Sequence, residues 1–287
     1  MSRTGVRAIR RSGLGRLTLG IAVCAHSLMG APSGGIPENP LLKQGYDDMY
    51  NLQFAGAHRA FHQYEESHPK DAMGPVSDAA AYLFQEFNRL HVLRSDLFVS
   101  DSTYLRAKKL SPDPKVKAAF EEDLQRADQL AARALSESPN DRTALLASAL
   151  RYALHANYEA LIAKENMQAL RDIKQAQRVG DELLQQCPEC YDANLAIGVE
   201  NYLLSQKAAP VRWLLDLTGA QTDKKAGLER LRIVAEKGMY LKPYAKVLLA
   251  IAALRDGNKH DAKVLLTDLA QEFPKNAVFH DELSKLS

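Results

Sequence analysis

The sequence has very few of the features that mark β-structure or a common enzyme active site. No stretch alternates Val, Ile or Thr with polar residues, and no Asn-Gly turn joins two apolar runs, which excludes the usual sheet classes. There is also no G-x-x-x-x-G-K-[ST] phosphate loop, no G-x-S-x-G nucleophile motif and no pair of carboxylates at catalytic spacing. These absences predict an all-α protein that is not an enzyme, with no catalytic and no cofactor-binding residues.

An excess of charge of one sign is also missing once the first 31 residues are set aside. The whole chain has 37 basic and 35 acidic residues. Five arginines lie among residues 1–31, where no acidic residue occurs, so the rest holds 32 basic and 35 acidic residues, a net charge of −3. Nucleic acid binding requires many uncompensated Lys and Arg side chains, and we therefore do not expect nucleic acid as a partner.

The first 31 residues have the order of charge and hydropathy that is typical of a secretory signal. Arginines precede a moderately apolar run at 17–31, which is too short for a membrane-spanning helix of about 20 apolar residues. We predict a signal peptide at 1–31, a Pro- and Gly-rich linker at 32–40 and one folded domain at 41–287. The protein would then be exported, to the periplasm or out of the cell, with outer-membrane association open. The rival interpretations are a cytosolic protein with a basic tail and an uncleaved anchor.

Apolar residues at helical spacing predict helices along the whole folded domain. The expected ranges are 41–52, 55–66, 77–90, 115–138, a helix capped at 141–143 and running to about 163, then 166–186, 193–206 and 224–237. The clearest unit is the last one, at 242–286. There Pro243 opens a helix, Gly257 ends it, a second helix runs to Pro274, and a short terminal helix follows.

This last unit recurs along the chain, marked by four prolines that each close a predicted helix. The prolines are Pro69, Pro139, Pro188 and Pro274. Twelve residues before each of them stands an alanine: Ala57, Ala127, Ala176 and Ala262. Small residues in this register let two helices approach closely. The pattern therefore predicts a stack of helix pairs.

The pattern resembles the tetratricopeptide repeat (TPR), a helix–turn–helix unit of about 34 residues. The resemblance is carried by Ala250, Ala262, Leu266 and Pro274. The four prolines lie 70, 49 and 86 residues apart, so the array is diverged, with some long or irregular helices. The resemblance implies a TPR-like α-solenoid of antiparallel helix pairs that acts as a non-enzymatic scaffold for protein–protein interaction.

Residues 191–279 also resemble a group of bacterial TPR-like envelope proteins. The residues that carry this likeness stand at 191–193, 212–215, 227–228, 238 and 240–241, together with the last helical unit. It implies a scaffold of the cell envelope and leaves the identity of the partner protein open.

The inner face of the first predicted helix is the candidate partner groove. In TPR domains that clamp a C-terminal carboxylate, Lys and Asn occupy this face. Leu42 and Tyr46 stand at the equivalent positions here, so binding of a chaperone-type tail is not expected. We predict instead an apolar groove at Tyr46, Met49 and Tyr50 that contacts another protein.

Cys187 and Cys190 form a C-x-x-C motif, and no other cysteine follows residue 31. A redox dithiol normally lies at a helix N-terminus, where the helix dipole lowers the thiol pKa. Cys187 instead closes a predicted helix, and no βαβ unit surrounds it. Three interpretations stay open: two small apolar residues at a turn, a structural disulfide in an oxidising compartment, and a redox or metal-binding pair.

His58 and His62 are four residues apart, with His68 nearby, but Arg59 stands where the zinc protease motif has its glutamate. We interpret these histidines as exposed and predict no metal site. Trp213 and its apolar neighbours favour packing between repeats. The alternative is an envelope assembly factor that contacts a membrane through Trp213.

Overall fold

The computed structural model describes residues 34–94, 109–205 and 223–286, and the secondary structure of this part is entirely helical. It contains 11 α-helices, one 3₁₀ turn and one π-helical turn. The all-α prediction is therefore confirmed. Among the described residues, no helix combines the length and the apolar character needed to cross a membrane.

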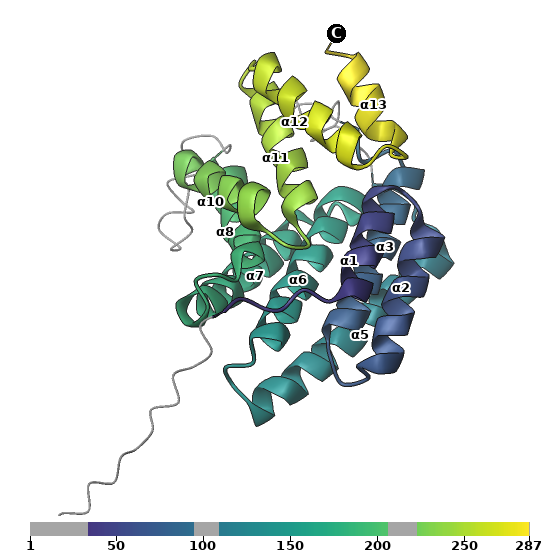
Figure 1. Cartoon of the computed structure of the whole chain (residues 1–287), viewed down its shortest axis with the longest axis vertical. Helices are drawn as coiled ribbons and strands as arrows, with labels where there is room; N and C mark the ends of the chain where they lie inside the picture. The colour runs from purple at the N-terminus through teal and green to yellow at the C-terminus, as the bar shows by residue number, and fades with distance from the viewer. Residues whose placement is uncertain (1–33, 95–108, 206–222, 287) are drawn as a thin grey trace, which may run out of the picture. The chain divides into compact units, whose positions relative to one another are not determined.

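The helices follow one another along the chain, and each described helix packs against the next one (Figure 1). Their bounds are α1 Pro40–Tyr50, α2 Phe54–Ser67, α3 Met73–Arg89, α5 Pro114–Glu137, α6 Arg142–Tyr158, α7 Asn166–Gln186, α8 Asn194–Ser205, α10 Lys224–Lys237, α11 Lys242–Arg255, α12 Lys259–Glu272 and α13 Ala277–Ser284. The π-helical turn Glu159–Ala163 extends α6, and the 3₁₀ turn Tyr191–Ala193 precedes α8.

The four prolines close helices as the sequence predicts. Each stands two residues beyond the last residue of a helix: Pro69 after α2, Pro139 after α5, Pro188 after α7 and Pro274 after α12. Proline disfavours helical backbone in the residue before it, which explains these ends. The four alanines twelve residues earlier are at most 2% exposed. They therefore lie in the packed interior, as expected for small residues that face a neighbouring helix.

Helix α1 shares one core with residues near the end of the chain. The Tyr50 hydroxyl donates a hydrogen bond to the Tyr240 carbonyl over 3.0 Å, and the Asn276 amide donates to the Tyr50 carbonyl over 2.7 Å. The Tyr46 and Tyr240 rings stack with centroids 5.0 Å apart. The backbone N–H of Asn39 donates to the Tyr240 hydroxyl over 3.0 Å. These contacts place C-terminal residues over the face of α1.

A buried carboxylate joins the 3₁₀ turn to the loop between α10 and α11. Asp192 accepts hydrogen bonds from the backbone N–H groups of Met239, Tyr240 and Leu241 at 3.0, 3.0 and 3.3 Å. Burial raises the pKa of Asp192 above its usual value, although these three donors lower it. The side chain therefore satisfies three backbone groups of a segment almost fifty residues away in the sequence.

The predicted linker is attached to the helices where the structure describes it. Arg142 of α6 donates to the carbonyl of Gly34 over 2.6 Å, and Ile36 packs against the core. Figure 1 shows this stretch crossing α6 on its way to α1. Pro40, the last residue of the predicted linker, is the first residue of α1.

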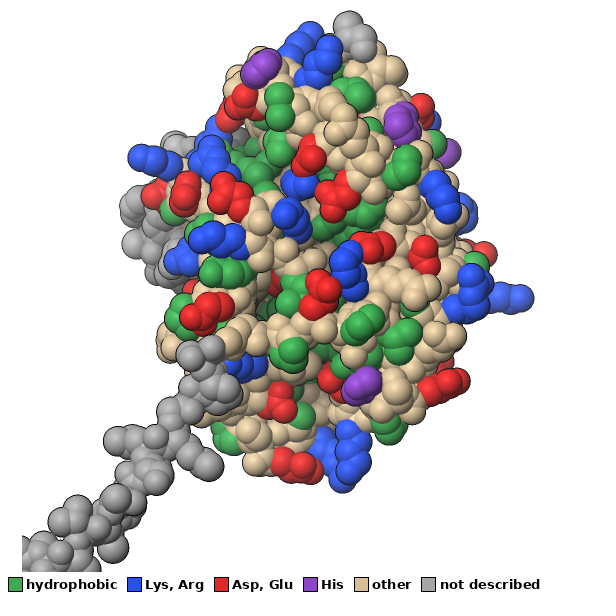
Figure 2. Space-filling view, in the orientation of Figure 1, with side chains coloured by type: hydrophobic (Ala, Val, Ile, Leu, Met, Phe, Trp, Pro, Cys, Tyr) green, Lys and Arg blue, Asp and Glu red, His purple; other side chains and the backbone are tan. Residues whose placement is uncertain are grey.

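Acidic and basic side chains are interspersed on the face that Figure 2 presents. Among the described residues of that face there is no broad area of one sign. This face therefore has no basic stripe of the kind that binds nucleic acid.

Candidate functional site

An apolar pocket lies where α1, α3, α11 and α13 meet. Its volume is about 60 Å³, whereas one water needs roughly 10–15 Å³ of comparable space. Large apolar side chains form most of the wall, among them Tyr50, Phe84, Leu93, Leu254 and Phe279. The pocket is therefore of the right size and polarity for one large apolar side chain.

Helix α11 supplies one wall of the pocket through a stripe of residues at helical spacing. Val247, Ala250, Ile251 and Leu254 all line it, at positions i, i+3, i+4 and i+7. Because the Ala250 side chain is small, it leaves open space that a larger side chain at this position would fill. This stripe belongs to the apolar face that the sequence predicts for this helix.

Aromatic rings connect the α1, α3 and α11 walls. The Phe84 ring stands edge-on to Tyr50 at 6.1 Å and to Tyr244 at 5.5 Å between centroids. Burial raises the pKa of Tyr244 to about 12, against a smaller opposing hydrogen bond to Asn157. Burial also raises the pKa of Tyr50, so both tyrosines are neutral near pH 7 and contribute no charge to the pocket wall.

Two polar residues line the pocket, and the protein itself uses their polar atoms. The Asn276 amide donates to the Tyr50 carbonyl and accepts from the backbone N–H of Val278 over 3.0 Å. The Glu282 carboxylate accepts from the Lys285 ammonium over 2.8 Å. A polar group that entered the pocket would lose its hydrogen bonds to water and gain none from the protein. The pocket therefore favours an apolar group.

A wider and more polar cavity adjoins the pocket. Its volume is about 450 Å³, and it shares Leu52, Leu93, Val278 and Glu282 with the apolar pocket. Charged and polar side chains line the rest, including His91, Arg94, Asp281 and Lys285. The apolar pocket therefore lies beside a polar cavity whose wall carries charges of both signs.

Two residues of this wall hold a left-handed backbone that glycine normally takes. Leu52 has φ of 58° and His91 has φ of 57°, directly beyond the ends of α1 and α3. Among the described residues other than glycine, Lys164 alone shares a positive φ with them. A left-handed backbone costs such residues roughly 1–2 kcal/mol. Here it ends the two helices, because it lets the backbone N–H groups of Gln53 and Val92 donate to the Asp48 and Phe87 carbonyls over 2.8 Å. Two of the three strained residues thus line the same cavity.

His91→Gly is expected to raise the free energy of unfolding by about 0.5–1 kcal/mol. Glycine removes the left-handed strain but gives the unfolded chain more freedom, and the first effect is the larger. Urea unfolding of the two proteins measures the difference. His91→Ala is the control, because it removes the exposed side chain and keeps the strain. An equal increase in the free energy of unfolding in both variants would show that relief of the left-handed backbone is not the cause.

The predicted groove residues Tyr46, Met49 and Tyr50 are all buried. Met49 and Tyr50 line the apolar pocket. Tyr46 lies in the core instead, where its ring meets Phe61 edge-on and its hydroxyl accepts a hydrogen bond from Ser77 over 3.0 Å. An open groove along α1 does not form, because C-terminal residues cover this face. Of the three predicted groove residues, Met49 and Tyr50 border the apolar pocket and Tyr46 does not.

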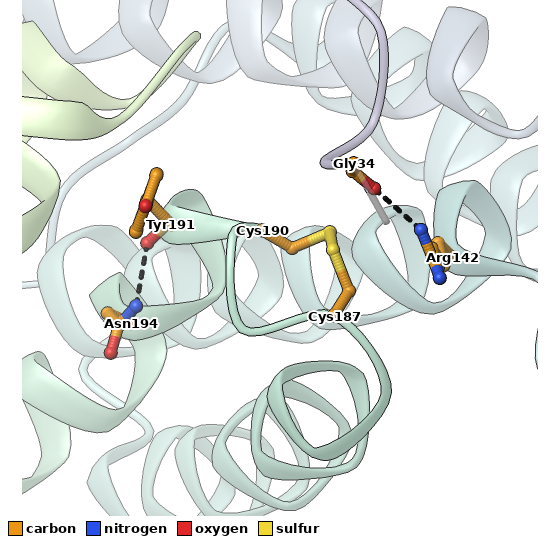
Figure 3. Close-up of a disulfide and its surroundings, with 6 residues drawn as sticks. All are labelled: Gly34, Arg142, Cys187, Cys190, Tyr191 and Asn194. Atoms are coloured by element: carbon orange, nitrogen blue, oxygen red, sulfur yellow. Dashed lines mark hydrogen bonds between the residues drawn. A yellow bond between two sulfur atoms is a disulfide. The ribbon is translucent and has the colours of Figure 1, made fainter. Parts of the chain in front are cut away.

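Cys187 and Cys190 form a disulfide with an S–S distance of 2.10 Å (Figure 3). It closes the turn between the end of α7 and the 3₁₀ turn, beside the hydrogen bond from Arg142 to Gly34. Both cysteines are buried. Thiol exchange needs an accessible sulfur, so this environment favours a structural role over a redox role.

Cys187→Ser together with Cys190→Ser is expected to lower the free energy of unfolding by about 2 kcal/mol, the loss of entropy restraint for so short a loop. Urea unfolding of wild type and variant measures this loss. A strong reductant should destabilise the wild type by a similar amount and leave the double variant unchanged. A reductant effect of equal size on both proteins would exclude the disulfide as its cause.

The prediction that His58 is exposed is wrong. Its side chain is 16% exposed, and its Nδ1 lies 2.5 Å from Oδ1 of Asp78. Burial lowers the pKa of His58, but the hydrogen bond and the charge of Asp78 outweigh this effect, so the pKa is raised. His62 also contacts Asp78 and is half-exposed, whereas His68 stacks on Tyr64 at 4.4 Å. Asp78 could not be linked to the histidines from the sequence alone.

Several predicted features lie outside the described residues. They are the signal peptide at 1–31, the likeness at 212–215, and Trp213, through which packing or membrane contact is expected. Compared with known proteins, the chain matches no family model and no curated protein.

Proposed function

We propose that this protein is a non-enzymatic scaffold of TPR-like helix pairs that binds another protein. The observation that carries the proposal is the apolar pocket between α1, α3, α11 and α13 with its polar neighbour. A few buried anchor side chains supply most of the affinity at protein interfaces, and a pocket that fits one such anchor is the usual receiving site. The run of helices that each pack on the next supports the repeat interpretation.

The occupant in this proposal is a segment of a partner protein with one large apolar side chain. That side chain fills the apolar pocket, where the polar wall atoms of Asn276 and Glu282 already have partners. The polar residues beside it enter the wider cavity, where Arg94, Asp281 and Lys285 offer charges of both signs. Such a segment would be amphipathic, with a single apolar anchor flanked by polar residues.

Export of the scaffold is part of the same proposal. Two observations support it: the basic and then apolar order of residues 1–31, and the disulfide between Cys187 and Cys190. Disulfides of this kind persist in oxidising compartments such as the periplasm. Fractionation of cells that express the full chain, with the disulfide trapped by alkylation, tests this part directly.

The binding proposal is tested by crosslinking in cells followed by mass spectrometry. Leu254→Arg places a charge in the pocket wall, and Val264→Arg is the matched control, because Val264 of α12 is 56% exposed and does not line the pocket. We expect a reproducible partner protein whose capture falls at least tenfold in Leu254→Arg and is unchanged in Val264→Arg. Equal capture by both variants would show that the pocket does not bind the partner.

A further inference from the structure

The charged side chains of the wider cavity come from two stretches of the chain. His91 and Arg94 follow the end of α3, whereas Asp281 and Glu282 belong to α13 and Lys285 directly follows it. The cavity shares part of its wall with the apolar pocket. The residues on either side of an anchor in that pocket would therefore face these charges.

Two of the charges on this wall are paired within the protein. The Glu282 carboxylate accepts a hydrogen bond from the Lys285 ammonium over 2.8 Å. Within the described ranges, the side chains of Arg94 and Asp281 have no ion-pair or hydrogen-bond partner, although both line the same cavity. Arg94 therefore supplies a free positive charge on the α3 side of the cavity, and Asp281 supplies a free negative charge on the α13 side.

Both of these side chains are exposed, so water solvates them while the cavity is empty. A segment that enters the cavity removes part of this water, and a charge that loses water without gaining a partner is costly. A carboxylate beside Arg94 offsets the cost, because the planar guanidinium suits that group, and a cation does the same beside Asp281. The volume of about 450 Å³ lies within the range of about 300–1,000 Å³ of ligand sites, which leaves room for such residues.

We infer that the partner segment carries an acidic residue on one side of its apolar anchor and a basic residue on the other. The acidic residue contacts Arg94, and the basic residue contacts Asp281. Two flanking residues of the same sign would place one of them beside a like charge. Complementary charges of this kind select the partner and speed its association. This inference rests on the proposed function, because it requires an anchor in the apolar pocket.

Synthetic peptides with a central phenylalanine test the inference, with binding to the purified full chain followed by fluorescence anisotropy. Glu and Lys flank the phenylalanine in one peptide and stand in the reverse order in a second, while a third has two Glu and a fourth has two Lys. One exposed ion pair changes affinity by up to about fivefold. We expect the better of the two mixed peptides to bind about fivefold more tightly than either peptide of one sign. This difference should shrink in about 0.5 M salt, which screens exposed charges.

Charge reversals in the cavity should change which peptide binds best. Arg94→Glu makes both free charges negative, so the peptide with two Lys should become the tightest. Asp281→Lys makes both positive, so the peptide with two Glu should become the tightest. Arg59→Glu and Glu66→Lys are the matched controls, because both residues are exposed on α2 and line neither the pocket nor the cavity. The controls should keep the preference of the wild type.

The outcomes separate this inference from the proposed function. Equal affinity of the wild type for all four peptides would overturn the inference alone, and so would an unchanged preference in Arg94→Glu and Asp281→Lys. A fifth peptide, with serine in place of the phenylalanine of the better mixed peptide, tests the pocket itself. If the serine peptide binds as well as its phenylalanine counterpart, the proposed function fails and this inference fails with it.

Discussion

Asp192→Ala is expected to lower the free energy of unfolding by about 3–5 kcal/mol. The Asp192 carboxylate accepts from three backbone N–H groups in the loop between α10 and α11. Two of these hydrogen bonds are buried, and alanine would leave the donors without a protein acceptor. A buried donor without a partner costs roughly 1–3 kcal/mol, and the loop can relax enough to offset part of the sum. Denaturant unfolding measures the loss.

Asp223→Ala is the matched comparison for this effect. Asp223 also accepts from two backbone N–H groups, those of Lys225 and Ala226, but as the exposed N-cap of α10. Loss of such a cap costs about 1 kcal/mol, because water replaces the carboxylate. Asp192→Asn, which keeps one acceptor oxygen, should fall between the two alanine variants. Similar losses in both alanine variants would contradict the importance of burial.

Gly227→Val is expected to destabilise the protein by about 3 kcal/mol or more. A Cβ at Gly227 would stand 2.7 Å from the backbone nitrogen of Tyr202 and 3.0 Å from the Gly198 carbonyl oxygen. These are backbone atoms of α8, so relief requires the two helices to move apart rather than a side chain to rotate. Such a movement would loosen the packing between α8 and α10.

Thermal and urea unfolding test this effect, with Ala226→Val as the control. Ala226 is the preceding residue of α10 and is exposed, so valine there changes helix propensity by less than about 1 kcal/mol and meets no neighbouring backbone. A large loss in Gly227→Val alone locates the cost at the helix contact. A comparable loss in both variants would assign it to the β-branched side chain instead.

Much of the helical organisation could be predicted from local sequence. The predicted helices at 166–186 and 224–237 have the bounds of α7 and α10. The four prolines close α2, α5, α7 and α12, because proline restricts the residue before it wherever it stands. The start of α3 was less well predicted: the helix begins at Met73, four residues before the predicted start. The Asp71 carboxylate caps this end, because it accepts a hydrogen bond from the backbone N–H of Met73 over 2.8 Å. The predicted start at Ser77 misses this cap.

The candidate sites could be predicted only in part. Met49 and Tyr50 can be selected from the sequence as apolar residues of α1, but most of the remaining pocket wall comes from α3, α11 and α13, up to about 230 residues away along the chain. Tyr46 has the same chemistry, yet it lies in the core against Phe61 and Tyr240. A helical period gives the apolar face of a helix and says nothing of how far its neighbours cover that face.

The sequence by itself determined the helical class, the helix ends and the alanines at close contacts, since periodicity, proline and side-chain size act over a few residues. Only the tertiary structure decided that C-terminal residues cover α1, that Asp192 accepts hydrogen bonds from a loop almost fifty residues away, and that Asp78 lies beside both His58 and Asp123. These outcomes depend on contacts between helices distant in the chain. Such contacts form wherever burial and hydrogen bonding are best satisfied, which no short pattern records.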